Sequence, residues 1–209
     1  MKTLILATQK GGAGKTTLAA HLAVAAEAAG AGPVALLDMD RQGSLAAWWN
    51  GRDASTPAFI NASLATVGKV LTDLPNAGFR LAIIDTPPVD HEGMASLLKA
   101  GSLVLIPIKP SPHDLRAAGA TVERVQEAER PFAFVLNMVK PNARLTAEAA
   151  AALSEHGPVA PSMIGDRVDF AGAMIDGRTV LELDPKGRSS GEVGALWKYV
   201  EKRINGKTK

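Results

Sequence analysis

The chain has 209 residues, a formal net charge of +2 at neutral pH and no cysteine. The absence of cysteine excludes a disulfide scaffold, a thiolate metal site, an iron–sulfur cluster and a cysteine nucleophile. Because the length suits one domain and no apolar run approaches the roughly 20 residues that cross a bilayer, we expect a single cytoplasmic domain over residues 1–209.

Short apolar runs alternate with longer helical patterns along the chain. Five near-continuous apolar runs are typical of parallel strands covered on both faces: Thr3–Thr8, Val34–Met39, Leu81–Asp85, Leu103–Ile108 and Phe132–Met138. Two weaker strand candidates are Ala58–Asn61 and Val159–Ile164. The clearest helical patterns lie over Lys15–Gly30, Pro112–Glu129 and Leu145–His156. This alternation predicts a three-layer α/β/α fold with a mostly parallel, twisted central sheet.

The segment after the first strand has the features of a phosphate-binding loop. Residues 9–17 read QKGGAGKTT, which departs from the pattern G-x-x-x-x-G-K-[ST] only at Gln9. The glycines let backbone N–H groups surround an oxyanion, and the helix N-terminus adds partial positive charge. Lys15 is placed to bridge the β- and γ-phosphates, and Thr16 to bind Mg²⁺. The expected nucleotide contacts are Gly11, Gly12, Ala13, Gly14, Lys15, Thr16 and Thr17.

A second lysine, Lys10, opens this loop, so that residues 10–17 read KGGAGKTT. The two lysines and the double glycine together resemble the deviant Walker A loop of the ParA/MinD family of ATPases. The resemblance implies a P-loop NTPase fold like that of nitrogenase iron protein, with ATP and Mg²⁺ as ligands. It also implies that Lys10 reaches the nucleotide of a partner subunit, so that a homodimer sandwiches two ATP molecules. A lysine supplied in trans stabilises phosphoryl transfer as an arginine finger does.

An acidic motif follows the second predicted strand. Residues 37–44 read LDMDRQGS, which resembles the family's D-x-D-P-Q motif with Arg41 in place of proline. The resemblance implies that Asp40 positions or activates the attacking water and that Asp38 supports the magnesium shell. Carboxylates two residues apart on a strand point the same way, which suits one shared cation. A strand-end turn in which an aspartate acts as a cap is the alternative.

A second acidic motif follows the strand over residues 81–84. This strand ends in Asp85, and the sequence DTPP of residues 85–88 resembles the family's Walker B motif, whose aspartate holds magnesium through its water shell. The expected magnesium site is therefore Thr16, Asp38 and Asp85. The expected catalytic residues are Lys10, Lys15 and Asp40.

Further segments extend the resemblance over nearly the whole chain. Asn137 and Met138 stand where the family contacts adenine, although a simple strand-end turn is the alternative for Asn137. Residues 104–114 resemble the strand and loop that lead to the family's dimer face, and residues 175–182 resemble small partition ATPases. The first predicted strand starts at residue 3, so the similarity is to compact ParA-type ATPases without an N-terminal helix–turn–helix.

The basic charge is concentrated at the end of the chain. Residues 186–209 hold seven basic and two acidic side chains, a local charge of +5, so the remainder of the chain sums to −3. A basic segment on a mildly acidic body indicates a polyanionic partner, either nucleic acid or an anionic membrane. A solvated terminal helix with a lysine-rich tail explains the same pattern. The expected DNA contacts are Arg178, Lys186, Lys198, Lys202 and Arg203.

The resemblance implies a nucleoid-associated partition ATPase with weak intrinsic activity. Its ATP-bound homodimer would bind DNA without sequence preference, and a ParB-like or other cargo adaptor would stimulate hydrolysis. Plasmids, chemoreceptor arrays, carboxysomes and cellulose synthase complexes are all possible cargoes.

Four other functions would each place a different demand on the sequence. A MinD-like membrane ATPase would insert the apolar stripe Leu196, Val200 and Ile204, but we expect that stripe to pack on the core. A reductase needs cluster-binding cysteines, and a synthetase needs a substrate pocket of which the sequence gives no sign. A non-catalytic binding module would lack the acidic motifs that are present here.

Overall fold

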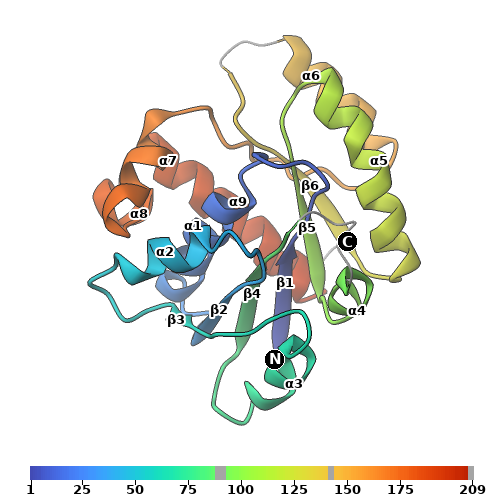
Figure 1. The fold of residues 1–209 in the computed structure, drawn as a ribbon. Coiled ribbons are helices and arrows are strands. Elements are labelled where there is room, and N and C mark those ends of the chain that lie inside the picture. Colours follow the sequence, from blue (N-terminus) through green and yellow to red (C-terminus); the bar gives the residue numbers. More distant parts are fainter. Residues whose placement is uncertain (88–92, 141–143, 207–209) are drawn as a thin grey trace.

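A sheet of six parallel strands forms the centre of the molecule (Figure 1). The computed structural model describes residues 1–87, 93–140 and 144–206. The strand order is β3-β2-β4-β1-β5-β6, with the bounds β1 (Lys2–Leu6), β2 (Val34–Asp38), β3 (Ala58–Phe59), β4 (Leu81–Asp85), β5 (Leu103–Ile108) and β6 (Phe132–Leu136). The four inner strands are almost wholly buried, which explains why they read as continuous apolar runs.

Helices cover both faces of the sheet. One face carries α1 (Lys15–Ala28), α2 (Ser44–Asn50), α7 (Val168–Ala173), α8 (Val180–Leu183) and α9 (Arg188–Ile204), with a short 3₁₀ helix over Met174–Asp176. The other face carries α3 (Val67–Asp73), α4 (Met94–Lys99), α5 (Pro112–Glu127) and α6 (Arg144–Ser154). This arrangement confirms the predicted three-layer α/β/α fold class. The clearest predicted helices correspond to α1, α5 and α6.

The parallel register brings three loops to one edge of the sheet. Leu6 of β1 pairs with Asp85 of β4, and Asp85 in turn pairs with Asp38 of β2. All three residues are the last of their strands. Ligands of open α/β sheets bind at the carboxyl ends of the strands. A ligand-binding site is therefore expected at the loops after β1, β2 and β4.

The strand predicted over Val159–Ile164 is wrong as a regular strand, and only isolated bridges form there. The segment does run beside β6: the N–H of Ala160 donates to the carbonyl of Phe134. A regular parallel ladder would continue with residue 162 donating to Leu136, but the N–H of Ile164 donates there instead. Two extra residues therefore bulge out and interrupt the ladder. The other weak candidate is confirmed as the short edge strand β3.

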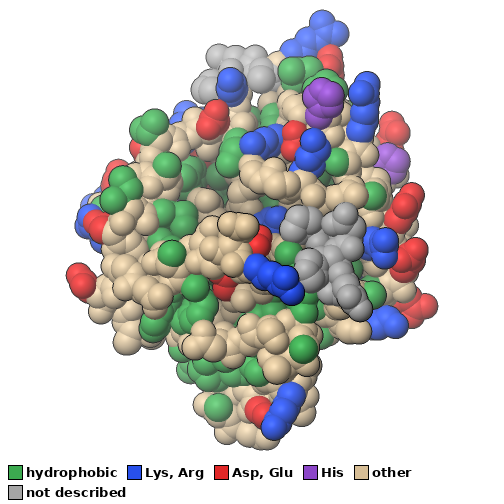
Figure 2. All heavy atoms as spheres, viewed as in Figure 1, with side chains coloured by type: hydrophobic (Ala, Val, Ile, Leu, Met, Phe, Trp, Pro, Cys, Tyr) green, Lys and Arg blue, Asp and Glu red, His purple; other side chains and the backbone are tan. Residues whose placement is uncertain are grey.

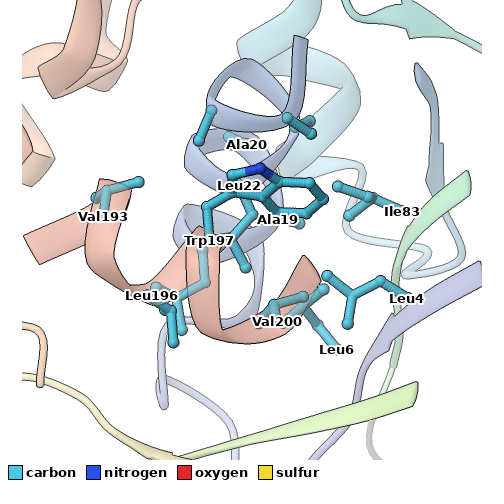
Figure 3. Close-up of a cluster of buried hydrophobic side chains, with 14 of the residues drawn as sticks. Leu4, Leu6, Ala19, Ala20, Leu22, Ile83, Val193, Leu196, Trp197 and Val200 are labelled. Atoms are coloured by element: carbon cyan, nitrogen blue, oxygen red, sulfur yellow. The ribbon is translucent and has the colours of Figure 1, made fainter. Parts of the chain in front are cut away.

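The apolar face of α9 is part of the core. Figure 3 shows Trp197 and Val200 of α9 pointing toward α1 and toward Leu4 of β1. Leu196 and Val200 are fully buried, and Ile204 is 7% exposed. The structure therefore confirms that Leu196, Val200 and Ile204 pack on the core. Within residues 1–87, 93–140 and 144–206, no helix is both long and apolar enough to cross a membrane.

His21 connects α1 with α8 inside this core. Its side chain is fully buried, and its Nε2 accepts a hydrogen bond of 3.2 Å from the N–H of Val180. The proton therefore lies on Nδ1, which donates to the carbonyl of Thr17 at 2.7 Å. Burial lowers the pKa of His21 to about 4, so the ring is neutral at physiological pH.

Candidate functional site

Glycines shape the loop between β1 and α1. Gly12 and Gly14 have left-handed φ angles of 71° and 87°, which favour glycine. A Cβ at Gly14 would also collide with the side-chain amide of Asn137. At Gly11, by contrast, no described atom lies within 4 Å of the Cβ position. The loop and the helix N-terminus behind it therefore have the form of a phosphate-binding site.

Lys15 is the buried cation of this site. It is the first residue of α1 and is 8% exposed. Burial lowers the pKa of its ammonium, whereas the charges of Asp85 and Asp40 raise it. The structure thus brings together three of the predicted site residues: Lys15 after β1, Asp40 after β2 and Asp85 at the end of β4.

Thr16 and Asp85 form the closest polar contact of the site. The hydroxyl of Thr16 donates a hydrogen bond of 2.5 Å to Oδ2 of Asp85. Asp85 is 1% exposed, and its Oδ1 has no hydrogen-bond partner among the described residues. Burial raises the pKa of Asp85 to about 7, against the opposing influence of Thr16 and Lys15. A buried carboxylate with an unused oxygen beside a hydroxyl fits Mg²⁺, which prefers oxygen ligands.

This pair would need further ligands to hold an ion. In the described ranges, no group of three or more His, Cys, Asp or Glu side chains is arranged to bind a metal. Mg²⁺ commonly keeps several waters and binds through one or two protein oxygens plus substrate phosphates. The donor set therefore fits a magnesium ion bound together with a nucleotide.

Asp38 has a structural role at the end of β2. Its Oδ2 accepts hydrogen bonds of 3.0 Å from the N–H groups of Leu45 and Ala46, in the first turn of α2. Its Oδ1 accepts a third bond of 3.0 Å from the N–H of Asp40. Through these bonds the side chain of Asp38 satisfies N–H groups in the first turn of α2, whose N-cap residue is Gly43, as the strand-end turn alternative expects. Its participation in a magnesium shell stays a prediction.

Asp40 lies beside an open hollow of about 650 Å³. The side chain is half-buried, and its Oδ1 accepts a bond of 3.0 Å from the N–H of Gln42. The hollow is also lined by Arg41, which is exposed, and by Ser63 and Leu64 from the segment after β3. The charge of Asp40 acts on Lys15, and the hollow that Asp40 lines is open to water. A carboxylate in this position is suited to orienting a water molecule.

Asn137 holds the phosphate loop from the end of β6. The side chain is 3% exposed, and its Nδ2 donates a hydrogen bond of 2.7 Å to the carbonyl of Ala13. The next residue, Met138, has a left-handed φ of 54°, and its Cε lies 3.5 Å from the Cβ position of Gly14. Both predicted adenine contacts therefore lie against the loop, and contact with a base stays a prediction.

Two further lysines lie in or next to the loop. Lys10 is exposed, and it forms no ion pair with any described residue. The second, Lys109, was not among the predicted site residues; its Nζ lies 3.9 Å from the Cβ position of Gly12. The signal that the sequence offered was a charged residue directly after the buried strand β5, at the carboxyl edge of the sheet.

The five predicted DNA contacts lie on the C-terminal part of the chain, from the 3₁₀ helix to α9. Arg178 forms an ion pair of 2.6 Å with Asp176, so its charge is partly compensated. Lys186 is exposed between α8 and α9. Lys198 and Lys202 are exposed one turn apart on α9, and Arg203 lies over the ring of Tyr199 with its guanidinium carbon 5.6 Å from the ring centre. On the face drawn in Figure 2, basic side chains are interspersed with acidic ones.

The glycine loop, the buried lysine and the threonine–aspartate pair define a P-loop nucleotide-binding protein. Residues 4–180 match the family model described as the CobQ/CobB/MinD/ParA nucleotide binding domain. The chain belongs to this family, which confirms the resemblance seen in the sequence.

Individual relatives agree with this assignment. Maintenance of carboxysome distribution protein A from Halothiobacillus neapolitanus is 31% identical over 201 residues, which cover 91% of this chain and 91% of the relative. MinD from Pyrococcus horikoshii, solved with Mg-ADP, matches 100% of this chain and 99% of its own with a TM-score of 0.81 at 16% identity. The ATP complex of a McdA variant from Cyanothece matches 100% of this chain and 98% of its own with a TM-score of 0.76 at 21% identity.

Proposed function

We propose that this chain is an Mg²⁺-dependent ATPase that positions a cellular cargo. The observation that carries the proposal is the 2.5 Å contact between Thr16 and Asp85 beside the buried ammonium of Lys15. The neighbours solved with Mg-ADP and with ATP support the choice of nucleotide. Similarity to a carboxysome distribution protein over 91% of the chain supports the positioning role.

Each residue of the site has a distinct task in ATP hydrolysis. Lys15 neutralises charge on the β- and γ-phosphates, and Thr16 with Asp85 holds the magnesium ion, which supplies further positive charge when bound. Asp40 orients the attacking water from the hollow beside it. Asn137 keeps the loop in shape through the carbonyl of Ala13.

Dimer formation completes the site through Lys10. The side chain is exposed at the mouth of its own loop, so it is free to reach a facing subunit. A cation delivered to the γ-phosphate of the partner subunit would stabilise the transition state and couple hydrolysis to assembly. The active form is thus a homodimer that encloses two ATP molecules.

The Lys10→Ala variant is expected to bind ATP as a monomer and to fail to dimerise, because the contact across the interface is lost. Light scattering at saturating ATP measures the mass of the particle. Gln9→Ala is the matched control, since it removes an exposed neighbouring side chain of the loop without removing charge. A dimer of normal mass from Lys10→Ala would rule out the ATP sandwich.

The ATP-bound dimer binds DNA without sequence preference and resides on the nucleoid in the cytoplasm. The exposed cations Lys198 and Lys202 on α9 supply phosphate contacts, and dimerisation doubles their number. The apolar face of α9 is buried in the core, which supports DNA over a membrane surface as the polyanion. The exposed segment of Arg41 and Gln42 next to Asp40 is accessible to a cargo-bound, ParB-like adaptor that stimulates turnover.

Joint replacement of Lys198, Lys202 and Arg203 by glutamine is expected to weaken DNA binding equally for unrelated sequences. Phosphate contacts carry no sequence information, and each contributes about 0.9 to the slope of log affinity against log salt. The slope should therefore become less steep in a titration of fluorescent duplex DNA with ATP present. The matched control replaces three exposed cations on the opposite face of the sheet, Lys69, Lys99 and Arg124. An unchanged slope in the α9 variant would place the DNA-binding surface elsewhere.

A further inference from the structure

The end of β5 places a third lysine at the phosphate loop. β5 pairs with β1 through Leu105 and Leu6, so the residue after β5 lies next to the loop that follows β1. That residue is Lys109, and its carbonyl accepts a hydrogen bond of 2.7 Å from the N–H of Ser111, the N-cap of α5. The lysine side chain therefore starts at the carboxyl edge of the sheet, between β5 and α5.

The ammonium of Lys109 lies over the loop itself. Its Nζ is 3.9 Å from the Cβ position of Gly12, a residue whose left-handed φ of 71° favours glycine. Since Gly12 has no side chain, no side-chain atom of residue 12 lies between the ammonium and the loop backbone. Lys109 and Asn137 therefore lie against different glycines of the loop, Gly12 and Gly14 respectively.

The charge of Lys109 has no compensation within the described part of the chain. The side chain is half-buried, and it is absent from the ion pairs formed by the described residues. The charge of Lys15, by contrast, is partly compensated, because the negative charges of Asp85 and Asp40 raise its pKa. A partly desolvated cation gains most from an anionic partner, and a phosphate oxygen is such a partner.

We propose that Lys109 is a further nucleotide-binding residue, whose ammonium contacts a phosphate oxygen of the ATP bound in its own subunit. This inference rests on the proposed ATP binding and adds a second cation in cis to Lys15. A lysine acts on phosphate as a flexible point charge, so the contact strengthens binding without requiring a fixed bidentate geometry.

The Lys109→Gln variant tests this inference by calorimetric titration with the non-hydrolysable analogue AMP-PNP and Mg²⁺. Loss of one charge-assisted hydrogen bond is expected to raise Kd about tenfold. The Kd of the variant should also depend less on salt than that of the wild type, and Lys109→Arg should restore most of the affinity. Lys99→Gln is the matched control, because it removes one exposed lysine at the end of α4, before β5 begins.

A second measurement uses the wild-type protein and does not depend on how any variant folds. Acylation of lysines by an amine-reactive reagent, read by mass spectrometry, should be slowed at Lys109 by AMP-PNP and unchanged at Lys99. Wild-type affinity in Lys109→Gln, or no protection of Lys109, overturns the inference while ATP binding by the wild type stands. Absence of AMP-PNP binding by the wild type would instead overturn the proposed function, and the inference with it.

Discussion

The Lys15→Ala variant is expected to lose at least about a hundredfold in affinity for ATP, which amounts to loss of binding at cellular concentrations. The ammonium is buried next to Asp85 and Asp40. Its removal leaves those two carboxylates to repel the phosphates of the nucleotide, in addition to deleting a charge-assisted bond. The loss of ATP affinity should therefore exceed the loss caused by removing Lys10 or Lys109.

Calorimetric titration with Mg-ATP measures this effect directly. Lys99→Ala serves as the control, because it deletes an exposed lysine far along the chain from the loop. Circular dichroism of both variants establishes that the fold is kept. ATP binding by Lys15→Ala with wild-type affinity would contradict the assignment of this loop as the phosphate site.

The Asp40→Ala variant is expected to keep ATP binding and dimer formation and to lose turnover by about 10²–10⁴-fold, the usual contribution of a positioned acid–base group. Asp40 is half-buried, and its side chain accepts one hydrogen bond among the described residues, from the N–H of Gln42, which lies outside the phosphate loop. The loop, Lys15 and the Thr16–Asp85 pair therefore remain in place without it. The ATP-bound dimer should accumulate.

Phosphate release and light scattering on the same sample separate these two effects. Asp73→Ala, at an exposed position at the end of α3, is the control for loss of a single carboxylate. Hydrolysis at the wild-type rate by Asp40→Ala would show that another group orients the water. Failure to bind ATP would instead give Asp40 a part in holding the nucleotide.

The sequence predicted those parts of the fold that depend on local pattern. The inner strands are buried on both faces, so their sequences are near-continuous apolar runs, and the glycine spacing of residues 10–17 predicts the loop. The interruption beside β6 was not predictable in this way, because residues 159–164 have the composition of a strand. Which N–H donates to Leu136 depends on the path of the chain through space.

The hydrogen-bond partners and close contacts of individual polar side chains were also not predictable from the sequence. Asp38 and Asp40 are two residues apart and both line the hollow, yet of the two only Asp38 accepts hydrogen bonds from the N–H groups of α2. The difference arises from the turn after β2, which aims the N–H groups of α2 at Asp38. The approach of Lys109 to Gly12 is not predictable from local sequence, because it depends on β5 lying next to β1 in the strand order.

The bond between Asn137 and Ala13 has a consequence for how the protein is made. The two residues are 124 positions apart, and β1 finds its neighbours in the sheet only when β4 and β5 have left the ribosome. The phosphate loop is thus among the first segments to be synthesised and among the last to be completed. Such distant pairings are slow to form, because the chain must close long loops before the contacts stabilise it. A nascent chain that ends before Asn137 carries the whole KGGAGKTT sequence without the hydrogen bond that Asn137 donates to the loop.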